Sequence, residues 1–367
     1  MTPPTLPKNI DPPPAPKVTF EQKQEKLATL MAAGKSAEAI ELIAEMLESQ
    51  EAVGESPLAR ETAATLSYRQ AEIRFGGPDK AKARPALEKA LGTEGAFQPS
   101  ARILLARILL ESGEETDFRA AVELLERNLD SKEMQKDRTA HERTLWRLGY
   151  LWYQKKNWER AAIRFRQAIQ FYPDSTEARQ GGYHLGMSYW FQAGTLGRSI
   201  AESEEKLKQP RLAEREKAES SRKLEEMYGE YTGFLKRARE PFSSLEVLLL
   251  KQSELTAGEL SLLQQTSFKA AACSFGLGEF DDCIKRYEDL AKRYEGQIDE
   301  LVARSQIWQC YAIYLKNKPQ EAAFALAKIR EAFPRIPDRE FDGTTPERRR
   351  AYWEDWLKNV QDISLRD

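Results

Sequence analysis

The sequence predicts an all-α protein, built as a solenoid of antiparallel helical hairpins. Three observations lead to this fold class. Helix-start signals follow one another with short gaps from Thr19 onward, no sustained alternation of apolar and polar residues indicates a strand, and a set of small and aromatic residues recurs along the chain. Because a solenoid grows by adding hairpins, a chain of 367 residues needs no single large core.

The helix-start signals are side chains that satisfy the free amide groups of a first turn. Thr19 and Gln22 form a capping box, in which each side chain accepts a hydrogen bond from the other residue's backbone amide. Ser56-Pro57 and Thr345-Pro346 each place a capping hydroxyl before a proline at the first helical position. Three further segments predict helix starts: Asp174–Glu177, Ser243–Glu246 and Thr256–Glu259.

The repeat is clearest between residues 142 and 189. A Leu-Gly pair is followed by an aromatic residue, an Ala-x-x-x-Phe segment, another alanine and a proline: Leu148, Gly149, Trp152, Ala161, Phe165, Ala168 and Pro173. The small residues allow two antiparallel helices to cross closely, the aromatic residues fill the space between hairpins, and the proline ends the second helix. In this pattern the segment resembles the tetratricopeptide repeat family, with Leu145 in place of the family's leading tryptophan.

Weaker copies of the pattern extend the resemblance to about residues 20–335. Leu185-Gly186 begins the next unit, with Tyr189 as its aromatic residue. Second-helix spacings recur in two later sets: Phe280, Cys283 and Tyr287, and Ala322, Leu326, Ile329 and Pro334. The resemblance implies a tetratricopeptide-like α-solenoid that binds other proteins.

One unit departs from the pattern, because no Ala-x-x-x-Phe helix follows Tyr189 on schedule. Residues 201–240 instead contain 10 acidic and 10 basic side chains, and Pro210 divides them. Within residues 211–239 a narrow apolar stripe recurs at i, i+4, i+7, i+11 and i+14, formed by Leu224, Tyr228, Tyr231, Leu235 and Ala238. This pattern predicts a charged helical insertion at 201–255, whose stripe packs on a partner surface, with residues 243–255 as the nearest candidate.

The chain therefore divides into three parts. Residues 1–18 contain seven prolines and are predicted to be a disordered, polyproline-like tail. Residues 19–335 form the repeat solenoid, and residues 336–367 form a loop and a C-terminal capping helix. The capping helix has an apolar face at i, i+3, i+4 and i+7, formed by Trp353, Trp356, Leu357 and Val360.

Composition argues against catalysis and against several classes of ligand. The formal net charge of −2 lacks the basic excess typical of nucleic-acid binders, so no nucleic-acid partner is expected. Three cysteines and two histidines are too few and too scattered for a metal centre or a disulfide framework. No phosphate-binding loop or nucleophile motif is present, so we predict no enzyme activity and no cofactor. No segment is long and apolar enough to predict a membrane span.

The predicted binding site is a second, aromatic stripe on the first helices of two units. Its members are Trp146, Tyr150, Tyr153, Tyr183, Met187 and Trp190, and Tyr311 and Tyr314 stand at equivalent positions further along. The family resemblance implies that these residues line a concave groove. Tryptophan and tyrosine are enriched at binding hot spots, so the groove is expected to hold a peptide or helix of another protein. Alternatively, the helix at 211–239 fills this groove from within the chain.

The predicted function is a non-catalytic protein-interaction scaffold or adaptor. Two alternatives remain open at this point: a regulatory subunit of an enzyme complex, or a bacterial envelope-assembly component. The second rests on a resemblance of the 171–175 junction to BamD-like lipoproteins. Without a signal peptide the sequence predicts a cytoplasmic location, or the cell envelope if a leader has been removed.

Overall fold

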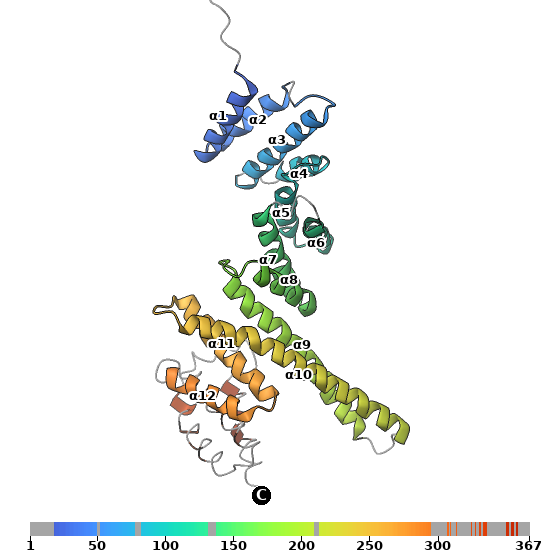
Figure 1. The fold of residues 1–367 in the computed structure, drawn as a ribbon, viewed down its shortest axis with the longest axis vertical. Coiled ribbons are helices and arrows are strands. Elements are labelled where there is room, and N and C mark those ends of the chain that lie inside the picture. The colour runs from blue at the N-terminus through green and yellow to red at the C-terminus, as the bar shows by residue number, and fades with distance from the viewer. Residues whose placement is uncertain are drawn as a thin grey trace, which may run out of the picture. The chain divides into compact units, whose positions relative to one another are not determined.

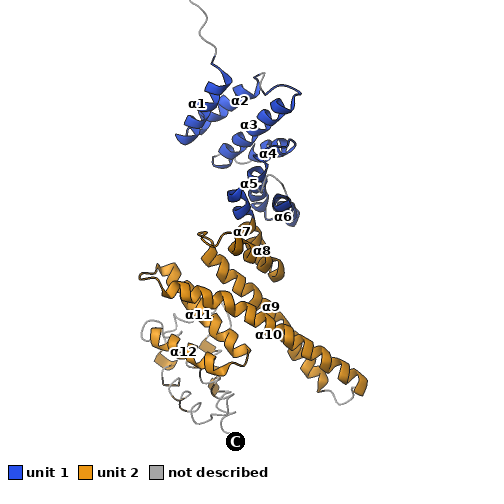
Figure 2. Cartoon of the chain, viewed as in Figure 1, with its two compact units in different colours: residues 1–144 blue, residues 145–367 orange. Residues whose placement is uncertain are grey.

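The structure is a computed structural model, in which every regular element of the described residues is helical (Figure 1). It describes residues 18–49, 52–77, 82–130, 137–208 and 213–294, together with separate positions between 307 and 358. The all-α prediction is therefore confirmed. The chain divides into two compact units, residues 1–144 and 145–367, which are described separately (Figure 2).

The first unit contains three consecutive helical hairpins. The paired helices are α1 with α2, α3 with α4 and α5 with α6, and each hairpin also contacts the next. Their bounds are Phe20–Ala32 (α1), Ser36–Leu47 (α2), Pro57–Phe75 (α3), Ala83–Leu91 (α4), Gln98–Leu110 (α5) and Glu115–Asp130 (α6).

Local sequence determines where several of these helices begin. The capping box of Thr19 and Gln22 at the start of α1 is confirmed, with both hydrogen bonds present. The Oγ of Ser56 accepts a hydrogen bond from the amide of Ala59 at 3.1 Å, so the predicted start of α3 is also confirmed. Between α1 and α2 the chain turns at Gly34, whose φ of 69° favours a residue without a Cβ.

The second unit contains the two longest helices of the described residues. The bounds of its helices are Arg138–Gln154 (α7, which begins at the end of the first unit), Trp158–Phe171 (α8), Ala178–Leu207 (α9), Glu214–Leu250 (α10), Ala257–Gly276 (α11) and Phe280–Tyr294 (α12). A short 3₁₀ turn spans Phe333–Arg335. Consecutive helices from α8 to α12 contact one another. The capping box of Thr256 and Glu259 begins α11, as predicted.

A small residue faces or adjoins a buried ring in each described hairpin of the second unit. A Cβ built on Gly149 would lie 2.8 Å from the ring of Phe165, and one built on Gly186 would lie 2.5 Å from that of Phe242. Ala271 and Tyr287 belong to one buried cluster in α11 and α12. The small residue thus lets the second helix of each hairpin place its ring at the crossing point.

The predicted insertion at 201–255 comprises the end of α9 and the whole of α10, and one predicted helix start is corrected. No helix begins at Ser243–Glu246, because α10 continues through Pro241 to Leu250. The buried residues Phe242, Leu245 and Leu249 extend the apolar stripe and stabilise the helix beyond the proline. By contrast, the start signal at Asp174–Glu177 is confirmed, because α9 begins at Ala178 with Glu177 as its N-cap residue. Residues 243–250 are therefore not a separate surface for the 211–239 stripe, which packs on α9 and α11.

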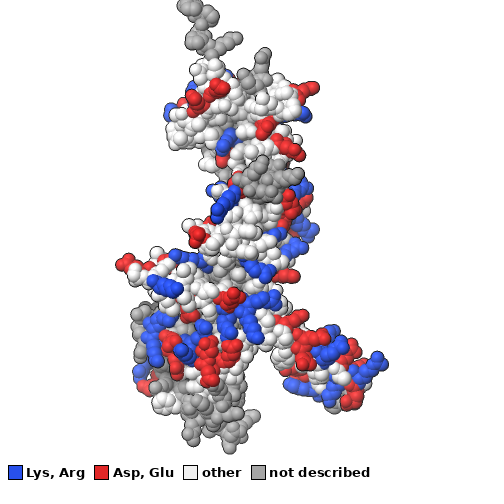
Figure 3. Space-filling model, viewed as in Figure 1, with Lys and Arg blue, Asp and Glu red and all other residues white. Residues whose placement is uncertain are grey.

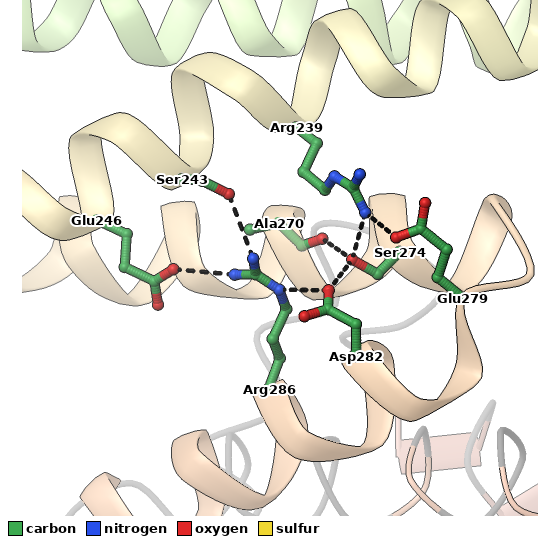
Figure 4. Close-up of polar contacts among 8 residues, drawn as sticks. All are labelled: Arg239, Ser243, Glu246, Ala270, Ser274, Glu279, Asp282 and Arg286. Carbon is green, nitrogen blue, oxygen red and sulfur yellow. Dashed lines mark hydrogen bonds and ion pairs between the residues drawn. The ribbon is translucent and has the colours of Figure 1, made fainter.

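Charged side chains are arranged differently at the two ends of the α9–α10 hairpin. Lysine, arginine and acidic side chains intermingle over its free end (Figure 3). Nearer α11 and α12 the charges instead form a network that joins three helices (Figure 4). Arg286 of α12 pairs with Asp282 at 2.8 Å and with Glu246 of α10 at 3.1 Å. Arg239 pairs with Glu279 and donates to the buried Ser274 of α11.

Several predictions lie outside the described residues. They concern the tail up to residue 17, Pro210, Cys310, Tyr311, Tyr314, the second-helix positions Ala322, Leu326 and Ile329, the helix start at Thr345-Pro346, and Trp353, Trp356 and Val360 of the capping helix.

Candidate functional site: an aromatic surface on α7 and α9

The α7–α8 hairpin holds the residues of the repeat motif. Leu148, Ala161, Phe165 and Ala168 have no exposed surface. The guanidinium of Arg160 lies 4.6 Å from the ring centroid of Trp152, which covers one side of this partly exposed indole. Pro173 follows Tyr172, the C-cap residue of α8. The hairpin therefore has a packed interior that can hold side chains of its outer surface in fixed positions.

The six residues of the predicted site divide into two groups. Trp146 and Met187 are buried, with 3% and 7% of their surface exposed. The indole of Trp146 packs over Gly181 of α9, where a Cβ would lie 2.1 Å from the ring. These two residues contribute packing between helices and offer almost no surface to a partner.

The other four residues are partly exposed: Tyr150, Tyr153, Tyr183 and Trp190. The rings of Tyr150 and Tyr153 lie 5.3 and 4.5 Å from the imidazole of His184 on α9. Tyr183 lies beside His184 and also contacts Phe242 of α10 at 5.9 Å. Three of the predicted residues therefore meet around one histidine.

His184 is uncharged at neutral pH. Burial among aromatic rings lowers the pKa of its imidazole to about 4. Its Nε2 lies 3.2 Å from the side-chain nitrogen of Gln180, whereas its Nδ1 is buried and has no hydrogen-bond partner among the described residues. A neutral imidazole fits within the rings without the cost of burying a charge.

Two further aromatic residues extend this surface beyond the predicted set. Trp158 of α8 and Phe191 of α9 stack with centroids 4.4 Å apart, and each also contacts Tyr153. Both are partly exposed. The sequence analysis predicted neither residue as part of the site, since their pairing depends on how α9 crosses α8.

Trp190 stands apart from the histidine group. The ammonium of Lys269 on α11 lies 4.8 Å from its ring centroid, so the indole takes part in a cation–π interaction between α9 and α11. The surface of α9 therefore continues towards α11. We use "aromatic surface" for Tyr150, Tyr153, Tyr183, His184 and Trp190.

The cysteines and acidic residues of the described ranges are not grouped as metal ligands. No group of three or more histidine, cysteine, aspartate or glutamate side chains there could hold a metal ion. Cys273 and Cys283 are buried, and burial raises the pKa of each thiol to about 12, which disfavours the reactive thiolate. No helix within the described parts is long and apolar enough to cross a membrane.

The profile of the tetratricopeptide repeat family matches residues 143–175, the α7–α8 hairpin whose packing is described above. Residues 143–175 therefore form a tetratricopeptide repeat. The match concerns the repeat type and does not extend to the BamD-like subgroup. No curated protein matches the sequence.

Three solved structures resemble the chain only distantly. A tetratricopeptide repeat protein from Parabacteroides merdae is 14% identical, with 85% of this chain and 93% of that chain covered and a TM-score of 0.38. The C-terminal part of a repeat-containing protein from Cytophaga hutchinsonii is 15% identical, with 82% and 98% covered and a TM-score of 0.35. The apo form of RapI is 10% identical, with 95% and 82% covered and a TM-score of 0.42. Similarities this low carry no information about a ligand or partner.

Proposed function

We propose that this tetratricopeptide repeat protein is a non-catalytic interaction scaffold, and that its aromatic surface binds a peptide or helix of another protein. Repeats of this family usually serve as protein-interaction scaffolds. The finer assignment depends on one observation: Tyr150, Tyr153, Tyr183 and Trp190 remain partly exposed on the first helices of two successive hairpins.

The chemistry of this surface suits recognition of a peptide. Tyrosine and tryptophan supply large rigid contact areas, and each keeps a polar group for a hydrogen bond. The neutral imidazole of His184 packs among these rings and keeps the surface uncharged at its centre. Such a combination favours an apolar side chain that is flanked by backbone amides, since both kinds of contact are then satisfied.

Substitution of the exposed aromatic residues tests the proposal. Partners are recovered from a lysate of the source cells with the wild-type chain, and the binding of the purified partner is then measured by calorimetry. We expect Tyr153→Ala and Trp190→Ala each to weaken binding by about 2 kcal/mol, as anchor residues do. Tyr228→Ala is the matched control, because Tyr228 is 42% exposed on the distal part of α10. Equal affinity of all three variants and the wild type would refute the assignment.

The buried members of the set should respond differently. Trp146→Ala is expected to lower the free energy of unfolding by about 3–5 kcal/mol, because it opens a cavity between α7 and α9. An affinity loss in this variant would report unfolding of the surface, so melting curves must accompany the binding data. The Trp190→Ala variant should keep a melting temperature close to that of the wild type.

A further inference from the structure

A groove lies between α8, α9 and α10, on a different side of α9 from the aromatic surface. Its volume is about 670 Å³. α9 lines it with Ala178, Gly182, Leu185 and Tyr189, at i, i+4, i+7 and i+11. Because each residue turns a helix by about 100°, this stripe points well away from Tyr183 and Trp190. A partner could therefore occupy the groove and the aromatic surface independently.

Gly182 is the feature of this groove that internal packing does not explain. A Cβ at Gly182 would meet nothing within 4 Å, whereas one at the neighbouring Gly181 would clash with Trp146. Gly181 is thus needed for packing, but Gly182 is not. A glycine inside a helix costs about 1 kcal/mol relative to alanine. The absence of a side chain at Gly182 keeps the floor of the groove open.

The walls of the groove fit a helix better than a small molecule. On α10 the lining runs from Arg237 to Leu248, which corresponds to three helical turns, or about 16 Å. Leu248 is 47% exposed, while Leu185 and Leu245 form a buried apolar floor. An apolar groove of this length between helices can accept the apolar stripe of a further helix.

The rim of the groove carries charges of both signs that form no ion pair with another described side chain. Arg166, Asp174 and Glu240 have no side-chain partner within the described part of the chain, and all three are exposed. Arg237 lies over the rings of Tyr189 and Phe234 and donates to the carbonyl of Gly233, without a carboxylate partner in the same part. Two positive and two negative groups are thus available to charges that flank an incoming stripe.

We propose that this groove is a second docking site, which takes an amphipathic helix of a partner protein whose apolar stripe is flanked by residues of both charge signs. The leucine floor contacts the apolar stripe of the helix, and the open position at Gly182 accommodates the largest side chain of that stripe. The charged rim determines the direction in which the helix binds. Binding here does not depend on the aromatic surface, so the two sites together allow one chain to join two segments.

The probe is a displayed library of amphipathic helices of about four turns, selected against the full chain. Selected peptides are then titrated against Gly182→Leu, which fills the floor, and Gly194→Leu, which is the matched control. Gly194 lies on the same helix and also has open space above it, but it does not line the groove. Both substitutions replace a helical glycine by leucine, which has a higher helix propensity, so neither should lower the melting temperature.

We expect selected peptides to carry a flanked apolar stripe, to lose at least about tenfold in affinity with Gly182→Leu, and to bind Gly194→Leu like the wild type. Leu248→Glu, at an exposed wall residue, should cause a similar loss if Gly182→Leu proves unstable. Equal affinity for all variants, or a loss caused instead by Trp190→Ala, would overturn the proposal. A change in oligomeric state with Gly182→Leu would also overturn it, because the occupant would then be a second copy of this chain.

Discussion

The α7–α8 and α9–α10 hairpins share one packing scheme at very different lengths. α7 and α8 contain 17 and 14 residues, whereas α9 and α10 contain 30 and 37. In the short hairpin Gly149 precedes its opposing Phe165 by 16 positions; in the long one Gly186 precedes Phe242 by 56. Forty additional residues therefore extend both helices outward and leave the crossing point intact.

The comparison shows where the missing second-helix motif of the long hairpin lies. Ala238-x-x-x-Phe242 in α10 has the spacing of Ala161-x-x-x-Phe165 in α8. All four side chains are fully buried. A tetratricopeptide unit thus tolerates a long insertion at its turn, because each hairpin is stabilised by contacts near its base and with its neighbours.

The largest expected effect tests whether the two rings have equivalent roles. Phe165→Ala and Phe242→Ala should each lower the free energy of unfolding by about 3–5 kcal/mol, because both rings fill the space above a glycine. Chemical denaturation followed by circular dichroism measures the loss. Phe171→Ala is the control, since Phe171 is 54% exposed, and it should change stability by less than about 0.5 kcal/mol. A small effect at Phe242 alone would break the equivalence.

A second test concerns the small residues one turn before these rings. Ala161→Leu and Ala238→Leu should each overpack a helix crossing and destabilise the chain by about 1–3 kcal/mol. Ala218→Leu provides the control, because Ala218 is exposed on the distal part of α10. If Ala238→Leu left the melting temperature unchanged, Ala238 would not occupy the crossing position that Ala161 occupies in the short hairpin.

A third test measures how the free energy of unfolding depends on pH, because His184 of the α9–α10 hairpin binds a proton less readily in the folded chain. The folded chain keeps His184 neutral down to about pH 4, whereas an unfolded imidazole binds a proton near pH 6.5. Between these values the unfolded state binds more protons, so this contribution to stability is complete above pH 6.5 and falls as the pH drops towards 4. We expect a loss of about 1–2 kcal/mol after allowance for residual solvent exposure.

Unfolding midpoints measured from pH 7 to pH 4.5 give the slope of stability against pH, and we expect stability to fall as the pH drops. His184→Gln should reduce this slope, because glutamine does not titrate. His141→Gln should leave part of the slope, since burial also lowers the pKa of His141 in the same direction. If the slope were unaffected by His184→Gln, the imidazole would be solvated rather than enclosed by Tyr150 and Tyr153.

Sequence reasoning was sufficient for the helices and for the α7–α8 repeat, because these depend on local spacing. Thr19, Ser56 and Thr256 begin helices where their capping patterns predict. The long hairpin was harder to predict, since Pro241 and Ser243 resemble a helix start. Only tertiary burial of Phe242 and Leu245 shows why α10 continues.

The helices that carry the candidate site could be predicted from the sequence, but the exposure of its side chains could not. Spacing placed Trp146, Tyr150 and Tyr153 on one stripe, yet Trp146 is buried because Gly181 of the next helix lets the indole approach closely. The groove beside Gly182 has an apolar i, i+4, i+7 stripe that could have been noticed on α9. Its depth depends on the neighbouring α8 and α10, which spacing alone does not specify.

The smallest expected effect concerns the free end of the long hairpin. Replacing residues 202–223 by a short Gly/Ser loop should change the free energy of unfolding by less than about 1 kcal/mol. The described residues of this segment are nearly all exposed, and the apolar stripe of α10 becomes partly buried only from Leu224 onward. Circular dichroism should show the lost helical residues, while the denaturation midpoint stays close to that of the full chain.

A loss of several kcal/mol would show instead that the charged end is part of the folded core, and that the two hairpins do not share a common stabilising base. A third result is also informative. If the shortened chain kept its stability but lost a partner that Trp190→Ala still binds, the mixed-charge end would itself be a recognition surface. The elongation would then be the functional difference between the two hairpins, because it adds exposed surface without altering the crossing of Gly186 and Phe242.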